Sequence, residues 1–482
     1  MDNDRKQLCE RLIKKVFQFA ELKASRIQRA ERLEQKIASI NATPAVEEEL
    51  KADLRKRERE YLRLMRRKIN VNLFEKIKML GKGAFGSVWL VREKSTQKYF
   101  AMKQLCKDEM IRRGQVEHCI TEKEIMASSV SDWIIRLYYS FQDDLYLYLV
   151  MEFAIGGDLM GLLIRVDLFP EPVARFYMSQ CCACINEIHK NNSFYRDAKP
   201  DNFLISESGH VKLSDFSLAK DFKSRPGTME VTTMSDEHLG TGSINPLASP
   251  TLSPGLSGTA SSLRSEATGS ITAPSMTVPD NVGIMHNRAY STVGTLDYSA
   301  VEIVRKDPGG YGHKVDWWSM GAILYECVFG YPPFGSDNPR DSVKKIVKYK
   351  QYLKFPADPK VSPECIDLIK HLICEPEERY DFEQIKAHPW FANVDWNDLH
   401  SYNPPFKPNV SSEVDLKYFD FVNEAKDGGP VEALPECKEQ VKWFSPPTFG
   451  NYTYRAFPGT VDLRTNANNR TNVKDLFKPP GN

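Results

Sequence analysis

Three glycines between two strand-like runs constrain the fold more than any other feature of this sequence. The run Gly81-Lys-Gly83-Ala-Phe-Gly86 is followed at once by Ser-Val-Trp-Leu-Val, a β-branched and aromatic stretch typical of a strand. A GxGxxG run that opens a helix is the fingerprint of dinucleotide-binding folds, so a following strand argues against such a fold. A strand–glycine loop–strand hairpin can lie over a triphosphate, because glycine has no Cβ to obstruct its backbone N–H groups. We therefore predict that Gly81, Gly83 and Gly86 bind nucleotide phosphates.

A lysine and a glutamate downstream of the glycines fit the same site. Lys103 stands in a second strand-like run, KYFAMK, where its charge can neutralise the α- and β-phosphates. Glu122 follows in a helical-looking run, VEHCITEKEIMASS, and could hold the lysine in place by an ion pair. Glu124 competes for that role, and either acid alone could be an ordinary surface residue.

The most specific signal is the run YRDAKPDN at residues 195–202, followed by KLSDFS at residues 212–217. Phosphoryl transfer depends on positioning and electrostatics rather than on covalent chemistry by the protein. Asp197 can accept the hydrogen bond of a substrate hydroxyl, and Lys199 can neutralise the transferring group. Asn202 and Asp215 supply the oxygen ligands that Mg2+ takes. We predict a site for ATP and Mg2+.

The order of elements predicts an α+β fold with two lobes. From Phe74 the runs are short and β-branched or aromatic, whereas helical patterns dominate after Gly157. With 482 residues the chain exceeds one typical domain. We expect a small β-rich lobe, a larger helical lobe and appendages at both ends.

The chain before the first strand is a basic arm. Residues 1–70 hold 19 Lys/Arg against 12 Asp/Glu, a net charge of +7 in a chain whose total is +1. Apolar positions at helical spacing over residues 5–40, then Thr43-Pro44 and a charged run to about Lys68, predict two helices. A basic arm can bind nucleic acid, an anionic membrane or an acidic protein, and charge alone does not choose among them.

Two further features of composition restrict the possibilities. Residues 224–288 are rich in Ser, Thr, Gly and Pro, and we expect a disordered insertion there. No run approaches the roughly 20 uncharged apolar residues that span a membrane, so we expect no integral membrane association. The scattered cysteines, including Cys181, Cys182 and Cys184, predict buried reduced thiols in preference to a metal site.

These motifs together resemble protein kinases, specifically the AGC group, over nearly all of residues 50–460. The resemblance implies the bilobal kinase fold over residues 74–391, with ATP and Mg2+ as cofactors. It implies that Asp316 braces the catalytic loop, that Glu302 pairs with Arg379, and that the catalytic residues are Asp197, Lys199, Lys103 and Glu122. It implies an adenine site formed by the glycine loop and by Leu80, Val88, Ala101, Met151, Glu152, Ala154 and Leu204.

Three features are similar to the NDR/LATS branch of that group: the basic arm, the long insertion, and the run Phe449-Gly-Asn-Tyr-Thr-Tyr near the C-terminus. The resemblance implies that residues 1–70 bind a Mob-type coactivator. It implies phosphorylation of Ser291 in the activation segment and of Thr453 by an upstream Ste20-type kinase. Residues 392–466 would form the C-terminal tail with its hydrophobic motif, tethered through Phe406 and Phe419, and residues 467–482 a terminal extension.

Substrate preference and compartment complete the expectations. Asp158, Asp201 and Glu326, together with Thr295, match positions that line the peptide groove, so we expect basic protein substrates. Each of the acids could instead be a plain surface residue. A cytoplasmic protein is expected, with nuclear or cortical and division-site locations also compatible, and a role in cell division or morphogenesis by analogy. Few aromatics lie among the basic residues of the arm, so no nucleic-acid partner is expected.

Several residues depart from the family pattern. Ser217 stands where the family usually has glycine, Ala198 replaces a leucine, and Leu296 and Val301 replace prolines. The insertion is nearly uncharged, whereas in the family it is often basic and autoinhibitory. These departures leave a pseudokinase scaffold as the alternative to an active kinase.

Overall fold

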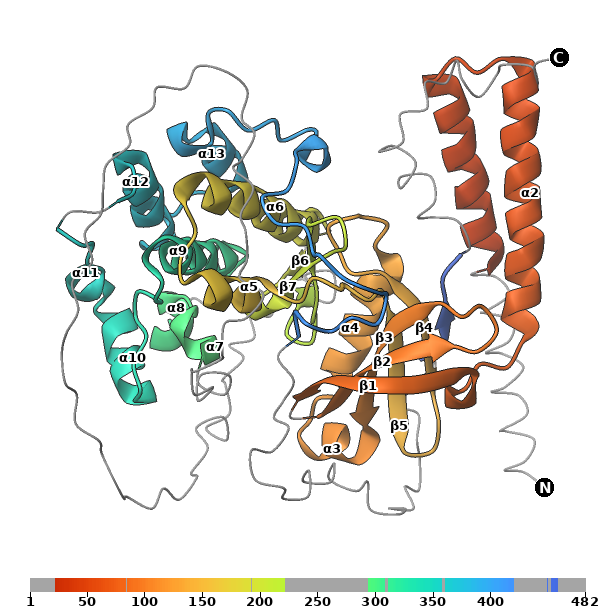
Figure 1. Ribbon diagram of the computed structural model, residues 1–482, viewed down its shortest axis with the longest axis horizontal. Helices are drawn as coiled ribbons and strands as arrows, with labels where there is room; N and C mark the ends of the chain where they lie inside the picture. The colour runs from red at the N-terminus through yellow and green to blue at the C-terminus, as the bar shows by residue number, and fades with distance from the viewer. Residues whose placement is uncertain are drawn as a thin grey trace.

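The computed structural model describes residues 22–83, 85–191, 193–221, 294–307, 311–357, 360–419, 449 and 452–457. Figure 1 shows a small lobe built around a twisted sheet, a larger helical lobe beside it, and a pair of helices that projects from the small lobe. The predicted α+β bilobal architecture is confirmed. The predicted insertion 224–288 and terminal extension 467–482 lie outside the described residues.

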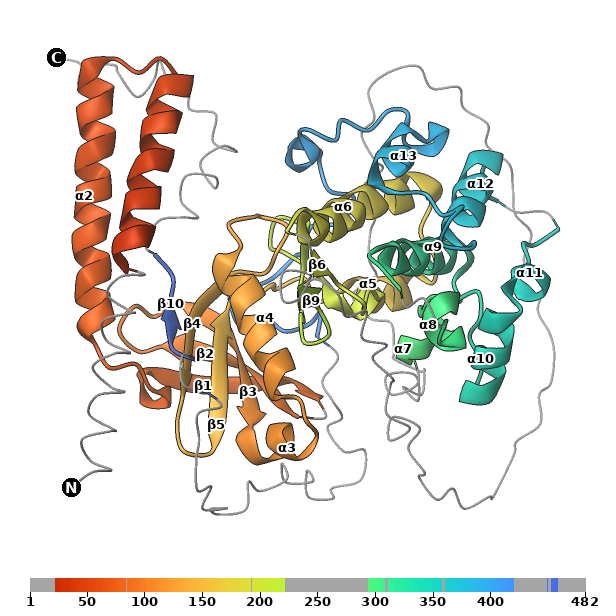
Figure 2. The same ribbon diagram turned by 180° about the vertical axis from the view of Figure 1, so that it is seen from behind.

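The projecting arm is a helical hairpin. Residues 22–39 are helical and run beside α2 (Pro44–Arg66), as both views show (Figures 1 and 2). Pro44 occupies the first turn of α2, where its missing N–H costs nothing, although the Thr43 side chain makes no capping hydrogen bond there. Arg29 Nε lies 2.8 Å from Glu58 Oε1 and links the two helices. The second predicted helix is confirmed, ending at Arg66.

The small lobe is an antiparallel sheet in the order β1-β2-β3-β5-β4-β10. Its elements are β1 (Phe74–Gly83), β2 (Gly86–Glu93), β3 (Tyr99–Cys106), α3 (Lys107–Arg112), α4 (Val116–Ser128), β4 (Leu137–Gln142), β5 (Tyr146–Met151) and β10 (Tyr454–Arg455). Side chains alternate between the two faces of each strand. Ala101 and Leu149 join the core cluster that includes α4 residues, whereas Met102 and Val150 join a second cluster on the other face. Both faces of the sheet are therefore covered.

The large lobe is mainly helical. Its elements are α5 (Leu159–Val166), α6 (Glu171–Lys190), β6 (Ser193–Phe194), η2 (Pro200–Asn202), β7 (Phe203–Ile205), β8 (Val211–Leu213), β9 (Lys220–Asp221), α7 (Gly294–Asp297), α8 (Val301–Arg305), α9 (Lys314–Phe329), α10 (Pro339–Val347), α11 (Tyr349–Tyr352), α12 (Pro363–Leu372) and α13 (Phe382–Ala387). Helix α9 is buried on nearly all sides and packs against α6 and α12, so it is the centre of the lobe.

A buried ion pair joins Glu302 of α8 to Arg379, which lies between α12 and α13. Arg379 Nη1 and Nη2 lie 2.6 and 2.9 Å from the two carboxylate oxygens of Glu302. The guanidinium also donates to the carbonyls of Lys314 and Cys374, at 2.9 and 2.7 Å. The side chain of Arg379 is completely buried. The predicted pairing of Glu302 with Arg379 is confirmed.

The C-terminal tail returns over the large lobe to the small one. Phe406 is buried and packs edge-on against Tyr418, and Phe419 stacks on Phe153 with ring centroids 5.4 Å apart. Farther along, β10 pairs with β4 in the register Tyr454↔Ser140. A strand from the far end of the chain thus covers the outer edge of β4. Over the described residues, no helix combines the length and apolarity needed to cross a bilayer.

Candidate active site

The glycine loop is the turn between β1 and β2. Gly83 pairs with Gly86 at its tip. A Cβ on Gly86 would lie 1.9 Å from the carbonyl oxygen of Gln104 in β3, so the neighbouring strand requires glycine there. A Cβ on Gly81 would meet nothing within 4 Å. Packing therefore does not explain Gly81, whereas close approach of a phosphate to its backbone would.

Lys103 connects the two lobes at the floor of the site. Its Nζ lies 2.7 Å from Oε1 of Glu122 on α4 and 3.2 Å from Oδ1 of Asp215. Burial alone would lower the pKa of Lys103, but the charges of Asp215 and Glu122 outweigh it and raise the pKa. Glu124 is exposed, so the structure selects Glu122 as the partner of Lys103. The position of α4 fixes this choice, because Cys119, Glu122 and Met126 share its buried face.

The loop at residues 195–202 gathers around Asp197. Its Oδ2 accepts hydrogen bonds from Lys199 Nζ at 2.8 Å and from Asn202 Nδ2 at 3.1 Å. Its Oδ1 is buried and has no hydrogen-bond partner among the described residues. Burial raises the pKa of Asp197, and the neighbouring charge of Lys199 opposes this. One carboxylate oxygen is thus held in place while the other is left for a ligand.

Asp316 of α9 braces this loop from below. Its two oxygens accept hydrogen bonds from the backbone N–H groups of Tyr195 and Arg196, at 2.8 and 2.7 Å. Oδ2 also lies 2.7 Å from Nε2 of His189. Arg196 has a φ of 70°, a left-handed conformation that needs such support in a residue with a Cβ. The predicted bracing role of Asp316 is confirmed by this geometry.

Asp215 and Asn202 are the candidates for holding an oxygen-ligated cation. The N–H of Ser214 donates to the carbonyl of Asn202 at 2.9 Å, which ties the two segments together. Burial acts to raise the pKa of Asp215, but Lys103 and hydrogen bonds from Ser217 and Lys103 lower it to about 2. A carboxylate ionised at all physiological pH values and a neighbouring amide oxygen are ligands suited to Mg2+. The residues present therefore fit this metal.

Most of the predicted adenine-site residues belong to the main apolar core cluster of the structure. Met151 and Ala154 are buried where β5 runs into the connection between the lobes. The cluster contains Ala101, Met151 and Ala154 as buried members and Leu80, Val88 and Leu204 as partly buried ones. Glu152 lies just after β5 and forms an ion pair with Lys212, whose Nζ is 3.0 Å from Glu152 Oε2. Leu80, Val88, Ala101 and Met151 come from four strands of the small lobe, and Leu204 comes from β7 of the large lobe.

The predicted peptide-groove residues have different surroundings. Asp158 caps α5, with its Oδ1 accepting from the N–H of Gly161 at 2.7 Å, and Asp201 is exposed. Glu326 is only 6% exposed, and its Oε2 accepts from the hydroxyl of Tyr298 at 2.5 Å. Burial, with the nearby charges of Asp201 and Asp297, raises the pKa of Glu326 to about 7. Thr295 belongs to α7 by its backbone, and its side chain is outside the described residues.

Of the two predicted phosphosites, Thr453 lies among the described residues and Ser291 does not. Thr453 is exposed, directly after Tyr452, whose buried hydroxyl lies 3.4 Å from Cys119 Sγ on α4. Cys119 is one turn away from Glu122 on the same helix. The tail therefore contacts the helix that positions the partner of Lys103.

Sequence reasoning missed two residues that structure brings to these sites. Tyr298 donates a hydrogen bond to Glu326 and lies between α7 and α8. Its place four residues before Glu302 in the sequence was the one signal that could have predicted a role for it. Arg455 donates to the carbonyl of Met65 at 2.7 Å and to that of Arg67, at the C-terminal end of α2. Its place directly after the hydrophobic motif was the available signal, but nothing local shows which partner it takes.

The three neighbouring cysteines of α6 behave as buried thiols. Cys181, Cys182 and Cys184 are all buried in α6, and burial raises the pKa of each thiol. A thiol with a raised pKa is a poor metal ligand at neutral pH. The prediction of buried structural cysteines is confirmed by the burial of all three.

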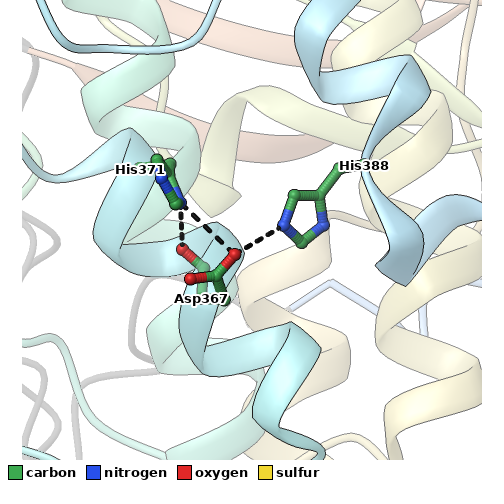
Figure 3. A group of neighbouring side chains, drawn as sticks. All are labelled: Asp367, His371 and His388. Carbon is green, nitrogen blue, oxygen red and sulfur yellow. Dashed lines mark hydrogen bonds and ion pairs between the residues drawn. The ribbon is translucent and has the colours of Figure 1, made fainter.

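One group of potential metal ligands, Asp367, His371 and His388, lies together in the large lobe, on α12 and just after α13 (Figure 3). His388 Nδ1 accepts from the N–H of Trp390 at 3.2 Å, so the neutral ring carries its proton on Nε2, which lies 3.1 Å from Asp367 Oδ2. His371 Nδ1 lies 2.9 Å from the carbonyl of Asp367, which requires a proton on that nitrogen. Both nitrogens that would face a metal are therefore donors, and hydrogen bonding accounts for the group.

Comparison with known proteins finds similarity to serine/threonine-protein kinases. The model of the protein kinase domain family matches residues 74–241 and 281–391. The chain is 40% identical over 430 residues to the serine/threonine-protein kinase CBK1 of Saccharomyces cerevisiae, covering 86% of this chain and 56% of that protein. It is 39% identical over 445 residues to CBK1 of Pneumocystis carinii, covering 90% and 83% of the two chains. It is 36% identical over 444 residues to the probable serine/threonine-protein kinase ndrB of Dictyostelium discoideum, covering 89% and 78%. The chain thus spans little more than half the length of the Saccharomyces protein.

Proposed function

The chain belongs to the protein kinase family, in the NDR/LATS branch of its AGC group, and from this we propose that it transfers the γ-phosphate of ATP to serine or threonine residues of basic proteins. The observation that carries the proposal is the buried Oδ1 of Asp197, which has no partner among the described residues while Oδ2 is fixed by Lys199 and Asn202. A buried carboxylate oxygen without a partner is costly, and a substrate hydroxyl would satisfy it.

In the proposed reaction each residue contributes electrostatics or orientation. Lys103, held by Glu122, binds the α- and β-phosphates beneath the glycine loop. Asn202 and Asp215 would hold Mg2+, which when bound neutralises charge on the phosphates. Asp197 accepts the hydrogen bond of the substrate hydroxyl and directs its oxygen at the γ-phosphorus. Lys199, 2.8 Å from Asp197 Oδ2, neutralises the phosphoryl group as it moves.

Phosphorylation of an arginine-containing peptide by the purified chain tests this function. The assay measures transfer of labelled γ-phosphate with and without a Mob-type coactivator and an upstream Ste20-type kinase. We expect transfer that rises when both are supplied. Absence of transfer under all four conditions would refute the proposal.

The pseudokinase alternative has no support from the described residues. Ala198 and Val301 are buried in the core, and Ser217 is accommodated without a positive φ. Lys103, Asp197, Asn202 and Asp215 are all present with mutual hydrogen bonds. Activity that appears only when Ser217 is replaced by glycine would favour the scaffold.

We propose that the arm binds a Mob-type coactivator through its exposed basic residues, which are Lys23, Arg26, Arg32, Lys36, Arg55, Lys56, Arg59, Arg63, Arg66, Arg67 and Lys68. Arg29 is not a suitable residue for testing this. Its guanidinium binds Glu58 and lies 4.3 Å from the ring centroid of Phe457 and 5.4 Å from that of Tyr61. Arg26→Glu with Arg32→Glu should abolish capture of the coactivator, whereas Arg29→Glu would disturb the arm itself. Capture by the double variant at wild-type affinity would exclude this surface.

The contact of the arm with the tail supports regulation through Thr453. Arg455, Tyr61 and Phe457 join the end of α2 to the segment just after Thr453. We propose that the upstream Ste20-type kinase phosphorylates Thr453 and that Ser291 is the activation-segment phosphosite. Phosphate-specific mass spectrometry of the chain incubated with the upstream kinase, against Thr453→Ala and Ser291→Ala variants, tests both sites.

Replacing Arg455 with alanine should release the tail from the arm. The variant loses two charged hydrogen bonds at a side chain that is 7% exposed, and each such bond contributes about 1.5–3 kcal/mol. Hydrogen exchange in residues 452–457 should therefore be at least tenfold faster than in the wild type. Arg63→Ala, at an exposed position of α2, is the matched control and should leave this exchange unchanged. Equal rates in both variants would contradict the role given to Arg455.

The pH dependence of substrate binding should reveal Glu326. With a pKa of about 7, raised by burial, its carboxyl is largely protonated at pH 6 and largely ionised at pH 8. If the ionised form binds a substrate arginine, KM for the arginine peptide should fall about tenfold from pH 6 to pH 8. Glu326→Gln, or a peptide without the arginine, should show a KM that is flat over this range. A tenfold fall that persists in Glu326→Gln would assign the titration to another group.

A further inference from the structure

The segment after β8 holds Asp215 and Phe216 in an inward arrangement. Asp215 Oδ1 lies 3.2 Å from Lys103 Nζ, and its backbone has a φ of 54°. The side chain of Phe216 is completely buried and meets Tyr195 edge-on, with ring centroids 5.7 Å apart. The left-handed φ of Asp215 is unfavourable for a residue with a Cβ, so the neighbouring contacts must hold it.

Ser217 is one of those contacts. Its N–H donates to Asp215 Oδ1 at 3.3 Å, which closes a short turn around the carboxylate. Its own φ is not positive, and its side chain is half-buried. The inward arrangement therefore places no strain on a serine, although most members of the family have glycine here.

The difference between serine and glycine appears when the segment leaves this arrangement. Removing Phe216 from the core requires rotation of the backbone over residues 215–217. Glycine at 217 would enter positive φ about as readily as negative φ. Serine in that region costs about 1–2 kcal/mol, so conformations with positive φ at residue 217 should be about 5- to 30-fold less populated than with glycine.

We propose that Ser217 is a positioning residue that stabilises the inward arrangement, because its Cβ excludes backbone conformations with positive φ at residue 217. Asp215 is thereby kept beside Lys103 before any ligand binds. The inference deepens the proposed function, since Asp215 is the residue that would hold Mg2+. It concerns the resting conformation of this chain and can be tested without phosphate transfer.

Hydrogen exchange of the full chain without nucleotide is the direct test. The measured quantity is the exchange rate of a peptide covering residues 213–219, corrected for intrinsic rates. We expect about 5- to 30-fold faster exchange in Ser217→Gly than in the wild type. Ser217→Ala keeps the Cβ and loses only the hydroxyl, so its rate should stay within about twofold of the wild type. Wild-type exchange in Ser217→Gly, or equally fast exchange in Ser217→Ala, would overturn the proposal.

Inhibitor binding gives an independent measurement. A diaryl-urea inhibitor fills the space left when this phenylalanine moves outward, whereas staurosporine occupies the adenine site and leaves it in place. Ser217→Gly should bind the diaryl urea about 5- to 30-fold more tightly and staurosporine with unchanged affinity. Loss of staurosporine binding in the variant alone would indicate misfolding. Ser217→Asn, whose residue type adopts positive φ more readily than serine, then replaces it, and wild-type exchange in Ser217→Asn would overturn the proposal. Failure of the wild type to bind staurosporine would count against the proposed function and not against Ser217.

Discussion

Asp197→Ala is expected to reduce phosphate transfer to an arginine-containing peptide by about 10²- to 10⁴-fold, the range found for general acid–base groups. The variant removes both the oxygen that would accept the substrate hydroxyl and the partner of Lys199. ATP affinity should change little, because the glycine loop, Lys103 and the apolar cluster around Met151 remain. Single-turnover transfer and nucleotide binding, measured on the same preparation, separate the two effects.

Two further variants sharpen this prediction. Asp197→Asn keeps the shape of the side chain and loses its charge, so a similar loss of transfer would show that the carboxylate itself is required. Asp144→Ala removes an exposed aspartate in the β4–β5 turn and should be fully active. If Asp197→Ala retained transfer within tenfold of the wild type, the role of Asp197 would be wrong.

Arg379→Ala is expected to destabilise the large lobe by about 3–5 kcal/mol, the cost of leaving one member of a buried ion pair without its partner. Arg379 is completely buried, and its loss strands the Glu302 carboxylate and the carbonyls of Lys314 and Cys374. Denaturant unfolding followed by the fluorescence of the buried tryptophans measures the change in unfolding free energy. Activity should fall in parallel, because Glu302 lies in α8 beside the activation segment.

A pair on the surface provides the control. Arg305 binds Asp307 and Glu375, at 2.9 and 2.7 Å, with its side chain 30% exposed. Arg305→Ala should cost no more than about 1 kcal/mol, since exposed ion pairs contribute little. The double variant Glu302→Leu with Arg379→Met leaves no buried charge and should recover much of the lost stability. Equal destabilisation in Arg379→Ala and Arg305→Ala would show that burial of the pair is not decisive.

Local patterns were sufficient for much of the fold and the site. The glycine loop and the strand after it form a hairpin between neighbours in sequence, so Gly81, Gly86 and the position of Lys103 could be predicted from short windows. The choice of Glu122 over Glu124 required the phase of α4. That phase is visible in hindsight, because Cys119 and Met126 mark the same helical face.

Long-range contacts explain what could not be predicted. Arg29 belongs to the basic arm, but it turns inward because Glu58 of the other arm helix and Phe457 of the tail meet there. Glu326 was expected to present a carboxylate to substrate, but its burial in α9 against Tyr298, which raises its pKa, depends on contacts that no local pattern contains. Asp367 and His371 lie one turn apart on α12, but His388 joins them only through the packing of the loop after α13 beside that helix. No window of sequence contains these partners.

The pairing of β10 with β4 has a consequence for the order in which the chain matures. The first five strands of the small lobe leave the ribosome hundreds of residues before Tyr454 and Arg455 are made. Until then the backbone N–H and C=O groups of Tyr139 and Ser140 are unpaired at the edge of the sheet. An extended segment of another chain could form hydrogen bonds with them. The small lobe is therefore synthesised first but completed last. A chain truncated before residue 454 would keep β4 as an unpaired edge strand, which can pair with other chains and cause aggregation.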